Sequence, residues 1–417
     1  MKKFNIFFLA DIVPYPPNTG IKIRTYNIVK QLAQKYNVYL FCFNHKIMIN
    51  SPEILQEYTT HLLSFCKDVK VFDIPSDKYK TTYYTLLARN LASKLPYRTQ
   101  RYYSAECVNA IKILLAKEKI HLAHFDKTEF FIYQRILGVI PIILTNHNIE
   151  SDLMRQRSKF EISHHRRFFA YLQYLKTRKY EINSLKNAYG FITCTQSDNN
   201  FFNNLIQTDK PSAVIPNGVD AQKYKPQNLN EKNYILIIGA QNKDSTANYD
   251  ATMYFLQKIW PKIVQAHPEV ELKIVGRHPD ASLLSIGQSQ PAIHVVGFVD
   301  DERSYIEESK MLVVPLRIGG GSRLKILTAM AMQKLVISTS KGAEGIECQD
   351  DHDILLADDA EEFAGKAIKA LSDYNLRSRI GKQARQMILA KYDWDKIGQK
   401  INTFYEKIIN DERHGCF

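Results

Sequence analysis

The residues best suited to chemistry lie in a glycine-rich stretch, VPLRIGGGSRLKILTAMAMQ (314–333). An apolar run that predicts a buried strand passes through consecutive glycines into a predicted helix. Glycines let a backbone pass close to a ligand, and the free N–H groups at a helix start attract an anion. Two basic side chains in the first turn oppose the helix dipole, and a bound diphosphate would compensate their charge. The candidate residues of this stretch are Gly320, Gly321, Ser322, Arg323 and Lys325.

A second candidate site follows the first predicted strand, in DIVPYPPNTGIKIRTYNIVKQLA (11–33). Prolines stiffen the approach to Gly20, and a helix that begins there carries Arg24 within its first turns. A rigid loop followed by a basic helix start would bind an anion. Each candidate has a plainer alternative. This stretch is equally typical of a structural turn, and Arg323 and Lys325 could be solvated side chains beside a flexible turn.

Several other classes of chemistry have no motif in the sequence. It contains no Walker lysine pattern, no GxGxxG and no HExxH. The 6 cysteines are scattered without a CxxC pair, so neither a zinc site nor a disulfide framework is predicted. We therefore expect no metal and no resident cofactor.

The charge and hydropathy of the chain limit its partners and its location. The formal charge is +13, from 56 Lys and Arg against 43 Asp and Glu, which favours anionic partners such as nucleotide phosphates, lipid phosphates or an acidic membrane face. No nucleic-acid-binding module accompanies this charge, so we expect no nucleic-acid partner. No window approaches the ~20 apolar residues that span a bilayer, and the N-terminal apolar run ends at Asp11 before any cleavage site. We expect a cytoplasmic protein, soluble or peripheral to the inner face of the cytoplasmic membrane.

The elements that must position these residues are predicted to be buried parallel strands separated by helices. Uniformly apolar runs, without alternation, are typical of strands buried on both faces. In the first half they are 4–11, 37–43, 122–126, 140–148 and 189–195, and in the second half 233–240, 270–276, 293–299, 311–317 and 334–339. The fold class is therefore α/β, with two doubly wound sheets in tandem joined near 212–228, and ligands are expected beyond the carboxyl ends of the strands. A final helix over 394–411 carries apolar residues at helical spacing and must bury one face.

With these elements in place, the chain resembles the retaining glycosyltransferases of family four, especially the bacterial branch that acts in surface polysaccharide and glycolipid synthesis. The order and spacing of the motifs carry the resemblance over nearly the whole chain. They are PYPPNTG with Arg24 (14–24), TNHNIES (145–151), IPNGVD (215–220), IWPKI (259–263), IVGRHP (274–279), VVGFVDD (295–301), VPLRIGGGSRLKILTAMA (314–331) and TSKGAEGI (339–346).

The resemblance implies a GT-B fold, with two Rossmann-like doubly wound domains facing across a cleft. Residues 1–211 would bind the acceptor, 212–392 would bind the nucleotide sugar, and 393–417 would form a helix that crosses back to the first domain. His147 and Gly20 would approach the transferred sugar or donor phosphate, although His147 could instead tie down a loop. Arg323 and Lys325 would hold the diphosphate. The other implied substrate-binding residues are Arg24, Asn148, Gly239, Arg277, Phe298, Val299, Gly320, Gly321, Ser322 and Thr328.

The reaction that the resemblance implies is metal-independent transfer of a hexosyl-type sugar, with retention, from a nucleotide diphosphate-sugar donor to a glycan, lipid-linked or other acceptor. It would need no protein nucleophile, because the departing phosphate oxygen takes the acceptor proton. Departure of the nucleoside diphosphate develops negative charge, which fixed cations and helix N–H groups stabilise.

The sequence departs from the family pattern at positions that usually hold glutamates, here Gly320 and Thr328. The second glutamate normally grips the ribose hydroxyls, and a threonine offers one neutral hydroxyl instead. The change would cost about 1–2 kcal/mol of donor binding. A second departure is that Lys243 is the only basic residue of its loop, where many members have an Arg and a Lys. The alternative function is therefore a non-catalytic GT-B binding or scaffold protein that has lost donor affinity.

The segment 151–186 is strongly basic and aromatic. It holds nine Lys or Arg against three acids, interleaved with Phe, Tyr and Leu. Such a segment fits a contact with an anionic membrane surface, which would bring the protein to a lipid-linked acceptor. It equally fits a helical pair that packs its apolar face on the first sheet and keeps its charges in water.

Overall fold

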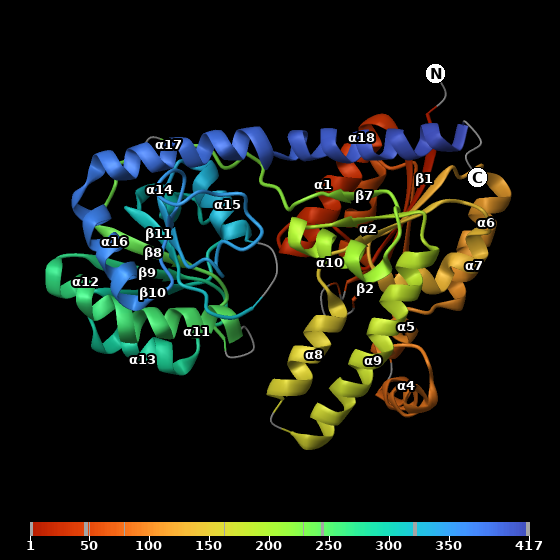
Figure 1. Ribbon diagram of the computed structural model, residues 1–417, viewed down its shortest axis with the longest axis horizontal. Coiled ribbons are helices and arrows are strands. Elements are labelled where there is room, and N and C mark those ends of the chain that lie inside the picture. Colours follow the sequence, from red (N-terminus) through yellow and green to blue (C-terminus); the bar gives the residue numbers. More distant parts are fainter. Residues whose placement is uncertain are drawn as a thin grey trace. The chain divides into compact units, whose positions relative to one another are not determined.

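The computed structural model describes residues 3–45, 49, 51–78, 80–161, 163–227, 229–242, 246–319 and 323–413. The chain divides into two compact units. The first comprises Met1–Pro216 together with Gly398–Phe417, and the second comprises Asn217–Ile397 (Figure 1). Among the described residues, no helix combines the length and apolarity needed to cross a bilayer.

The first unit is built on a parallel sheet with the strand order β3-β2-β1-β4-β5-β6-β7. Its strands are β1 (Asn5–Ala10), β2 (Asn37–Asn44), β3 (Asp68–Asp73), β4 (Leu122–Phe125), β5 (Ile142–Asn146), β6 (Gly190–Thr193) and β7 (Ser212–Val214). Its helices are α1 (Gly20–Lys35), α2 (Pro52–Leu63), α3 (Pro75–Lys78), α4 (Lys80–Ala92), α5 (Tyr97–Arg101), α6 (Ala105–Lys117), the 3-10 helix η1 (Thr128–Tyr133), α7 (Gln134–Leu137), α8 (Glu150–Phe160), α9 (His164–Asn187) and α10 (Gln196–Ile206). This strand order is that of a doubly wound sheet, with its switch point between β1 and β4.

The second unit repeats the same plan with the strand order β10-β9-β8-β11-β12-β13. Its strands are β8 (Tyr234–Ile238), β9 (Glu271–Val275), β10 (Ile293–Gly297), β11 (Met311–Val314), β12 (Val336–Ser338) and β13 (Leu355–Leu356). Its helices are α11 (Thr246–Tyr254), the π-helix η2 (Phe255–Ile259), α12 (Trp260–Ala266), α13 (Ala281–Ser289), α14 (Arg303–Glu308), α15 (Leu324–Ala331), α16 (Ala360–Ser372) and α17 (Tyr374–Lys391). The predicted α/β class with two doubly wound parallel sheets is confirmed.

The predicted strands all form, and the strands that the sequence analysis missed lie at sheet edges. β3 is mostly half-buried, β7 is half-buried, and β13 has only two residues. Edge strands need no uniformly apolar run, because one side of each has no partner strand. β7 belongs to the first sheet, where Ser212–Val214 pairs with β6, and the first compact unit extends to Pro216.

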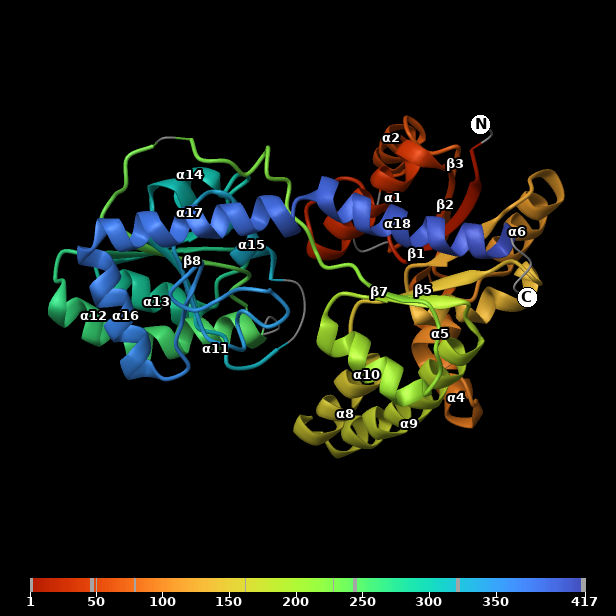
Figure 2. The same ribbon diagram turned by 45° about the horizontal axis from the view of Figure 1, so that its top comes forward.

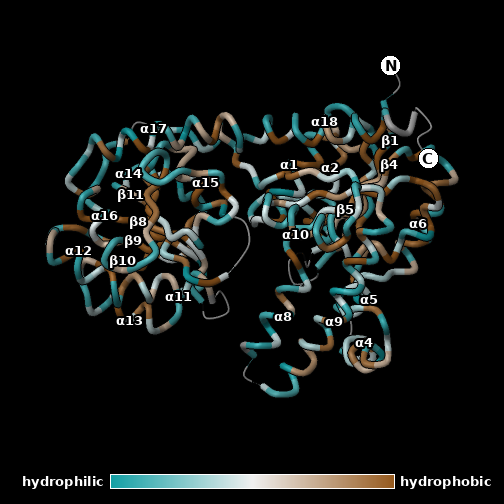
Figure 3. Tube along the Cα trace, viewed as in Figure 1, coloured by the Kyte–Doolittle hydropathy of each residue, from teal (hydrophilic) through white to brown (hydrophobic). Residues whose placement is uncertain are grey.

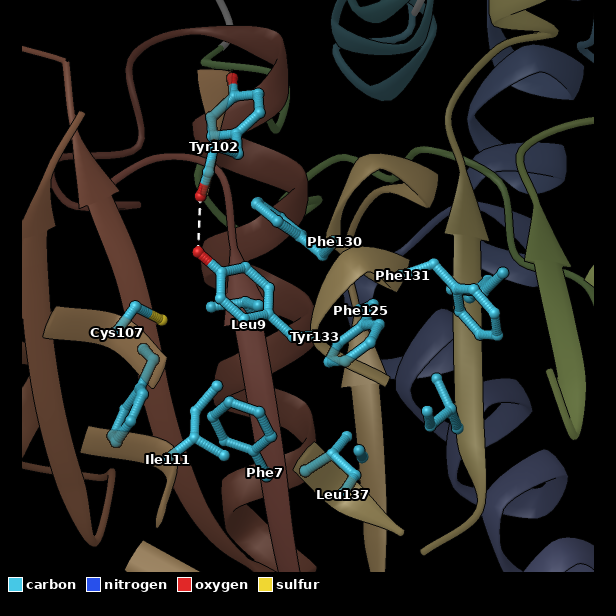
Figure 4. Packing of buried hydrophobic residues seen from close by; sticks show 14 of the residues in the cluster. Phe7, Leu9, Tyr102, Cys107, Ile111, Phe125, Phe130, Phe131, Tyr133 and Leu137 are labelled. Carbon is cyan, nitrogen blue, oxygen red and sulfur yellow. Dashed lines mark hydrogen bonds between the residues drawn. The ribbon is translucent and has the colours of Figure 1, made fainter. Parts of the chain in front are cut away.

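The core of the first unit is rich in aromatic side chains. Phe7 meets Phe41 at a centroid distance of 5.1 Å in a T-shaped arrangement. Figure 4 shows Tyr133 among this cluster, and its hydroxyl donates a hydrogen bond to the backbone O of Tyr102 at 2.6 Å. Buried tyrosines need such a partner for their polar atom. The hydropathy view places hydrophobic residues along the strands of both units (Figure 3).

The last helix, α18 (Trp394–Arg413), packs with its C-terminal part on the first unit. A Cβ at Gly398 would lie 2.2 Å from Oε1 of Gln31 in α1, so a larger residue there would have to displace the Gln31 side chain. Tyr405 is fully buried and hydrogen-bonds to Nδ1 of the buried His124. Figures 1 and 2 both show α18 running beside α1. The predicted amphipathic helix is confirmed, with Ile401 and Ile408 fully buried.

Candidate functional site

The candidate residues fall into two groups, one at the carboxyl end of each sheet. Gly20, Arg24, His147 and Asn148 belong to the first unit. In the second unit lie Gly239, Arg277, Phe298, Val299, Arg323, Lys325 and Thr328. Gly320, Gly321 and Ser322, and Lys243 in the other loop, lie outside the described residues. Each group is built from loops that follow parallel strands, the expected place for ligands in such sheets.

In the first group, a buried carboxylate organises the site. Asp126 follows β4 and is fully buried. Thr25 Oγ1 donates to its Oδ2 at 2.6 Å. Nε2 of His147 donates to its backbone O at 2.8 Å and lies 3.2 Å from its Oδ1. Burial would raise the pKa of Asp126, but the positive charge of His147 and these hydrogen bonds hold that pKa below its ordinary value.

His147 is consequently a cation at neutral pH. Burial alone would lower its pKa, but Asp126 and a hydrogen bond with Cys194 raise that pKa to about 10. Cys194 follows β6 and also faces Arg24. Although burial would raise the pKa of this thiol, Arg24 and His147 hold it below its ordinary value. Both interpretations of His147 therefore have support, because the ring ties the β5 loop to Asp126 and also presents a positive charge.

Gly20 and Arg24 lie on the first turns of α1. Gly20 is the first residue of the helix, and Thr19 is its N-cap without a side-chain cap bond. Arg24 is 2% exposed, and its Nη1 donates to the backbone O of Pro216 at 3.0 Å. Asn148 is half-buried in the loop between β5 and α8. Arg24 thus anchors the end of the first unit as well as facing Cys194.

The second group is centred on two cations at the start of α15. Arg323 is the N-cap residue and Lys325 lies in the first turn, so the helix begins slightly later than the predicted start near Ser322. Arg323 is 8% exposed, and its Nη2 donates to the backbone O of Lys341 at 2.8 Å. Glu344 is 3.5 Å from the same Nη2. Among the described residues, Nε of Arg323 has no hydrogen-bond partner.

Lys325 is half-buried and has no carboxylate partner in the described part of the chain. Its Nζ donates to Oδ1 of Asn248 in α11 at 2.7 Å. Burial and the nearby charge of Arg323 lower the pKa of Lys325 to about 8. Two cations held together at a helix start make a local excess of positive charge, which a bound anion would relieve.

Glycines connect three loops of the second unit, the first of which contacts Lys325. Gly239 has a φ of +147°, and a Cβ there would lie 2.8 Å from Nζ of Lys325. A Cβ at Gly276 would lie 1.7 Å from the backbone O of Gly239, so the loops after β8 and β9 touch through their backbones. The backbone N of Gly276 in turn donates to Gly297 at 2.8 Å. This chain of contacts connects the cations to the loop after β10.

The loop after β10 presents an aromatic face. Phe298 is 56% exposed, and the guanidinium carbon of Arg277 lies 4.8 Å from the centroid of its ring. Val299 is half-buried beside it. A flat, exposed ring with a cation over it is a surface on which a planar base could stack.

Thr328 stands where the sequence resemblance places the family's second glutamate. Its Oγ1 donates to the backbone O of Lys325 at 3.0 Å, so its proton is used within its own helix. The oxygen lone pairs stay able to accept a hydrogen bond. The side chain therefore offers one neutral acceptor, where a glutamate would offer a charged pair.

The sequence analysis missed the residues that hold the predicted ones. Asp126 fixes His147, Asn248 binds Lys325, and Glu344 faces Arg323. Asp126 could have been identified from the sequence, because it ends an apolar run at the carboxyl end of a predicted strand. Asn248 and Glu344 carried no such signal, since each lies in a polar stretch whose fold contacts could not be read from spacing. No group of three or more His, Cys, Asp or Glu that could hold a metal occurs among the residues described.

Comparison with known proteins defines the class of the chain. Residues 18–223 match the family model described as "Glycosyltransferase Family 4", and residues 232–373 match "Glycosyl transferases group 1". A sucrose-phosphate synthase structure from Thermosynechococcus elongatus superposes with a TM-score of 0.68 at 16% identity, covering 97% of this chain and 99% of that one. Anabaena HepE in complex with UDP superposes with a TM-score of 0.63 at 14% identity, covering 97% and 100%. The fold is GT-B.

The curated relatives agree over shorter stretches. An uncharacterized 44.6 kDa protein in the cps region of Klebsiella pneumoniae is 25% identical over 43% of this chain. An uncharacterized glycosyltransferase of Methanocaldococcus jannaschii is 27% identical over 28% of the chain. The chain spans 47% and 31% of the lengths of these two relatives. Together with the two family models, these matches class the chain with the family-four-like glycosyltransferases.

Proposed function

We propose that the protein transfers a sugar from a nucleotide diphosphate-sugar to a glycan, lipid-linked or other acceptor, with retention and without a metal. The observation that carries the proposal is the pair of cations at the start of α15, the buried Arg323 and the half-buried Lys325. Lys325 has only the neutral Asn248 as its hydrogen-bond partner among the described residues. A bound diphosphate would supply the negative charge that this pair of cations lacks.

The second unit would bind the donor along the connected loops that run from Lys325 to Phe298. The diphosphate would lie on Arg323, Lys325 and the N–H groups of the helix start. The base would stack near Phe298 and Arg277, and the ribose would reach Thr328. Fixed cations stabilise the charge that develops as the nucleoside diphosphate leaves, at little cost of reorganisation.

The first unit would hold the sugar and the acceptor. His147, kept as a cation by Asp126, would hydrogen-bond to the donor sugar or phosphate from its side, and Gly20 would allow close approach of the backbone. No side chain is assigned as a nucleophile. The acceptor hydroxyl would pass its proton to the departing phosphate oxygen as the new bond forms on the same face of a hexosyl-type sugar.

The relatives suggest where to look for substrates. HepE has been solved with UDP and with UDP-glucose, so uridine nucleotides are the first donors to test. One curated relative lies in a cps region, which supports a role in surface polysaccharide synthesis at the inner face of the cytoplasmic membrane. The basic α8–α9 segment supports an anionic membrane partner. A non-catalytic binding protein is the weaker alternative, because Thr328 keeps an acceptor for the ribose.

Donor binding is tested by thermal shift with UDP, GDP, ADP, TDP and CDP. We expect one nucleotide, at about 100 times its Kd, to raise the Tm by about 5–10 °C. The double variant Arg323→Ala with Lys325→Ala should lose this shift. Arg379→Ala with Lys382→Ala removes the same charges from exposed positions on α17 and should keep it. Equal stabilisation of both double variants, or none of the wild type at millimolar nucleotide, would contradict the proposal.

A further inference from the structure

A large groove in the first unit lies outside the residues assigned above. It runs between α4 and α9, reaches α5 and α8, and has a volume of about 1040 Å³. Figures 1 and 2 both show α4, α8 and α9 gathered on one side of the first unit. α4 and α9 are far apart in the sequence, so this surface could not be recognised from the basic segment alone.

The walls of the groove expose large apolar side chains. Tyr84 and Leu91 of α4 are 64% and 59% exposed, and Phe168 of α9 is 62% exposed. Tyr83 lines the same groove and is 43% exposed. Contiguous apolar surface of this kind is uncommon on a protein that meets only water, and it marks a place of contact.

The base of the groove is fixed by buried amides. Gln173 of α9 donates from Nε2 to Oδ1 of Asn90 in α4 at 2.8 Å. Asn90 in turn donates to Oε1 of Gln100 at 2.7 Å, and the backbone N of Tyr97 donates to Oε1 of Gln173 at 2.8 Å. Asn90 and Gln173 are 0% and 5% exposed. These hydrogen bonds hold α4 and α9 at a fixed separation. The apolar side chains therefore line a groove whose walls are fixed by the fold.

The charged residues that line the groove are all basic or histidine. Arg98, Arg157, His165 and Arg166 contribute to the lining, which contains no Asp or Glu among the described residues. Arg98 is paired with Glu150 beneath the groove, and Arg157 lies 3.6 Å from Glu161. Arg166 is exposed. The groove thus combines apolar walls with positive charge, which suits an anionic amphiphile better than a free anion or an uncharged chain.

We propose that the groove between α4 and α9 binds an anionic phospholipid of a membrane surface, with a hydrocarbon chain between Tyr84 and Phe168 and the phosphate at Arg157 and Arg166. Tyrosines suit this position, because their rings lie at the boundary between headgroups and chains. The inference rests on the proposed function in one respect. Lipid binding would serve to bring the protein to a lipid-linked acceptor. The lipid contact itself stands on the groove alone.

The test is co-sedimentation of the full chain with vesicles of phosphatidylcholine, with and without phosphatidylglycerol. We expect binding to the anionic vesicles only. Tyr84→Ser with Phe168→Ser should weaken it at least about tenfold, and Arg157→Gln with Arg166→Gln about thirtyfold. The controls Tyr374→Ser and Arg135→Gln change exposed residues elsewhere and should bind like the wild type.

Three results would overturn the lipid site. The first is that the wild type does not bind to anionic vesicles. The second is that the groove variants bind as tightly as the wild type. The third is that the arginine double variant loses binding while the aromatic double variant binds like the wild type. The third result would mean that the basic surface is attracted to the anionic vesicles without a lipid hydrocarbon chain entering the groove. The nucleotide-induced rise in Tm is measured on the same proteins. Because the donor residues lie in the other unit, the groove variants should keep it, so failure of the lipid site is distinguishable from failure of the proposed transfer.

Discussion

At the scale of single residues, the donor candidate differs from ordinary surface cations because Lys325 has no carboxylate partner in the described part of the chain. Exposed lysines contribute little and keep their ordinary pKa. Lys325 is held against Gly239 and Asn248, and burial with the charge of Arg323 lowers its pKa to about 8. A lowered lysine pKa beside a second cation at a helix start is typical of a site prepared for an anion.

This lowered pKa predicts how donor affinity depends on pH. A bound diphosphate stabilises the ammonium form and raises the pKa of Lys325, so affinity should fall about twofold from pH 7 to 8 and then more steeply, approaching about tenfold per pH unit. Lys325→Arg keeps its charge and should show no such fall. Calorimetric titration between pH 7 and 9.5 measures both. An identical fall in the arginine variant would mean that another group titrates.

The sequence predicted the identity of the cations but not their environment. Arg323 and Lys325 were identifiable because they follow consecutive glycines after an apolar run. The contacts of Lys325 with Asn248, and of His147 with Asp126, join residues 77 and 21 positions apart. Spacing along the chain does not report such contacts, so the pKa values of these groups could not be predicted before the fold.

At the scale of elements, the apolar runs predicted the central strands and left out the edges. β1 is buried throughout, whereas β3 and β7 expose part of their surface and lack the uniform pattern. The amphipathic period of α18 was recognisable, because its buried residues repeat at helical spacing. Its close approach to α1 at Gly398 was not, since it depends on an absent side chain.

The packing of α18 predicts its contribution to stability. Ile401 is fully buried, and Ile401→Ala should destabilise the first unit by about 2–4 kcal/mol through lost contact and the cavity left behind. Lys400→Ala changes the exposed neighbour and should alter stability by less than about 0.5 kcal/mol. Urea unfolding followed by circular dichroism compares the two. Equal stability of both variants would show that α18 does not pack on this unit in solution.

At the scale of the whole molecule, two units of one plan carry different chemistry at the same structural position. Both place their candidate residues in loops after the carboxyl ends of parallel strands. The first offers a histidine cation held by Asp126, and the second offers the pair Arg323 and Lys325. The structure also shows where some of the basic residues behind the net charge of +13 lie. Some line the α4–α9 groove, and others lie at the start of α15.

The central claim is sugar transfer, and release of nucleoside diphosphate from a nucleotide sugar tests it most directly. The protein is incubated with the sugar donor of the stabilising nucleotide, first in water and then with a lipid extract as the source of acceptor. The account predicts slow release in water, faster release with acceptor, and a loss of about 10²-fold or more in the Arg323→Ala, Lys325→Ala variant. A donor that binds to the wild type but stays intact under both conditions would contradict the account and identify a binding protein.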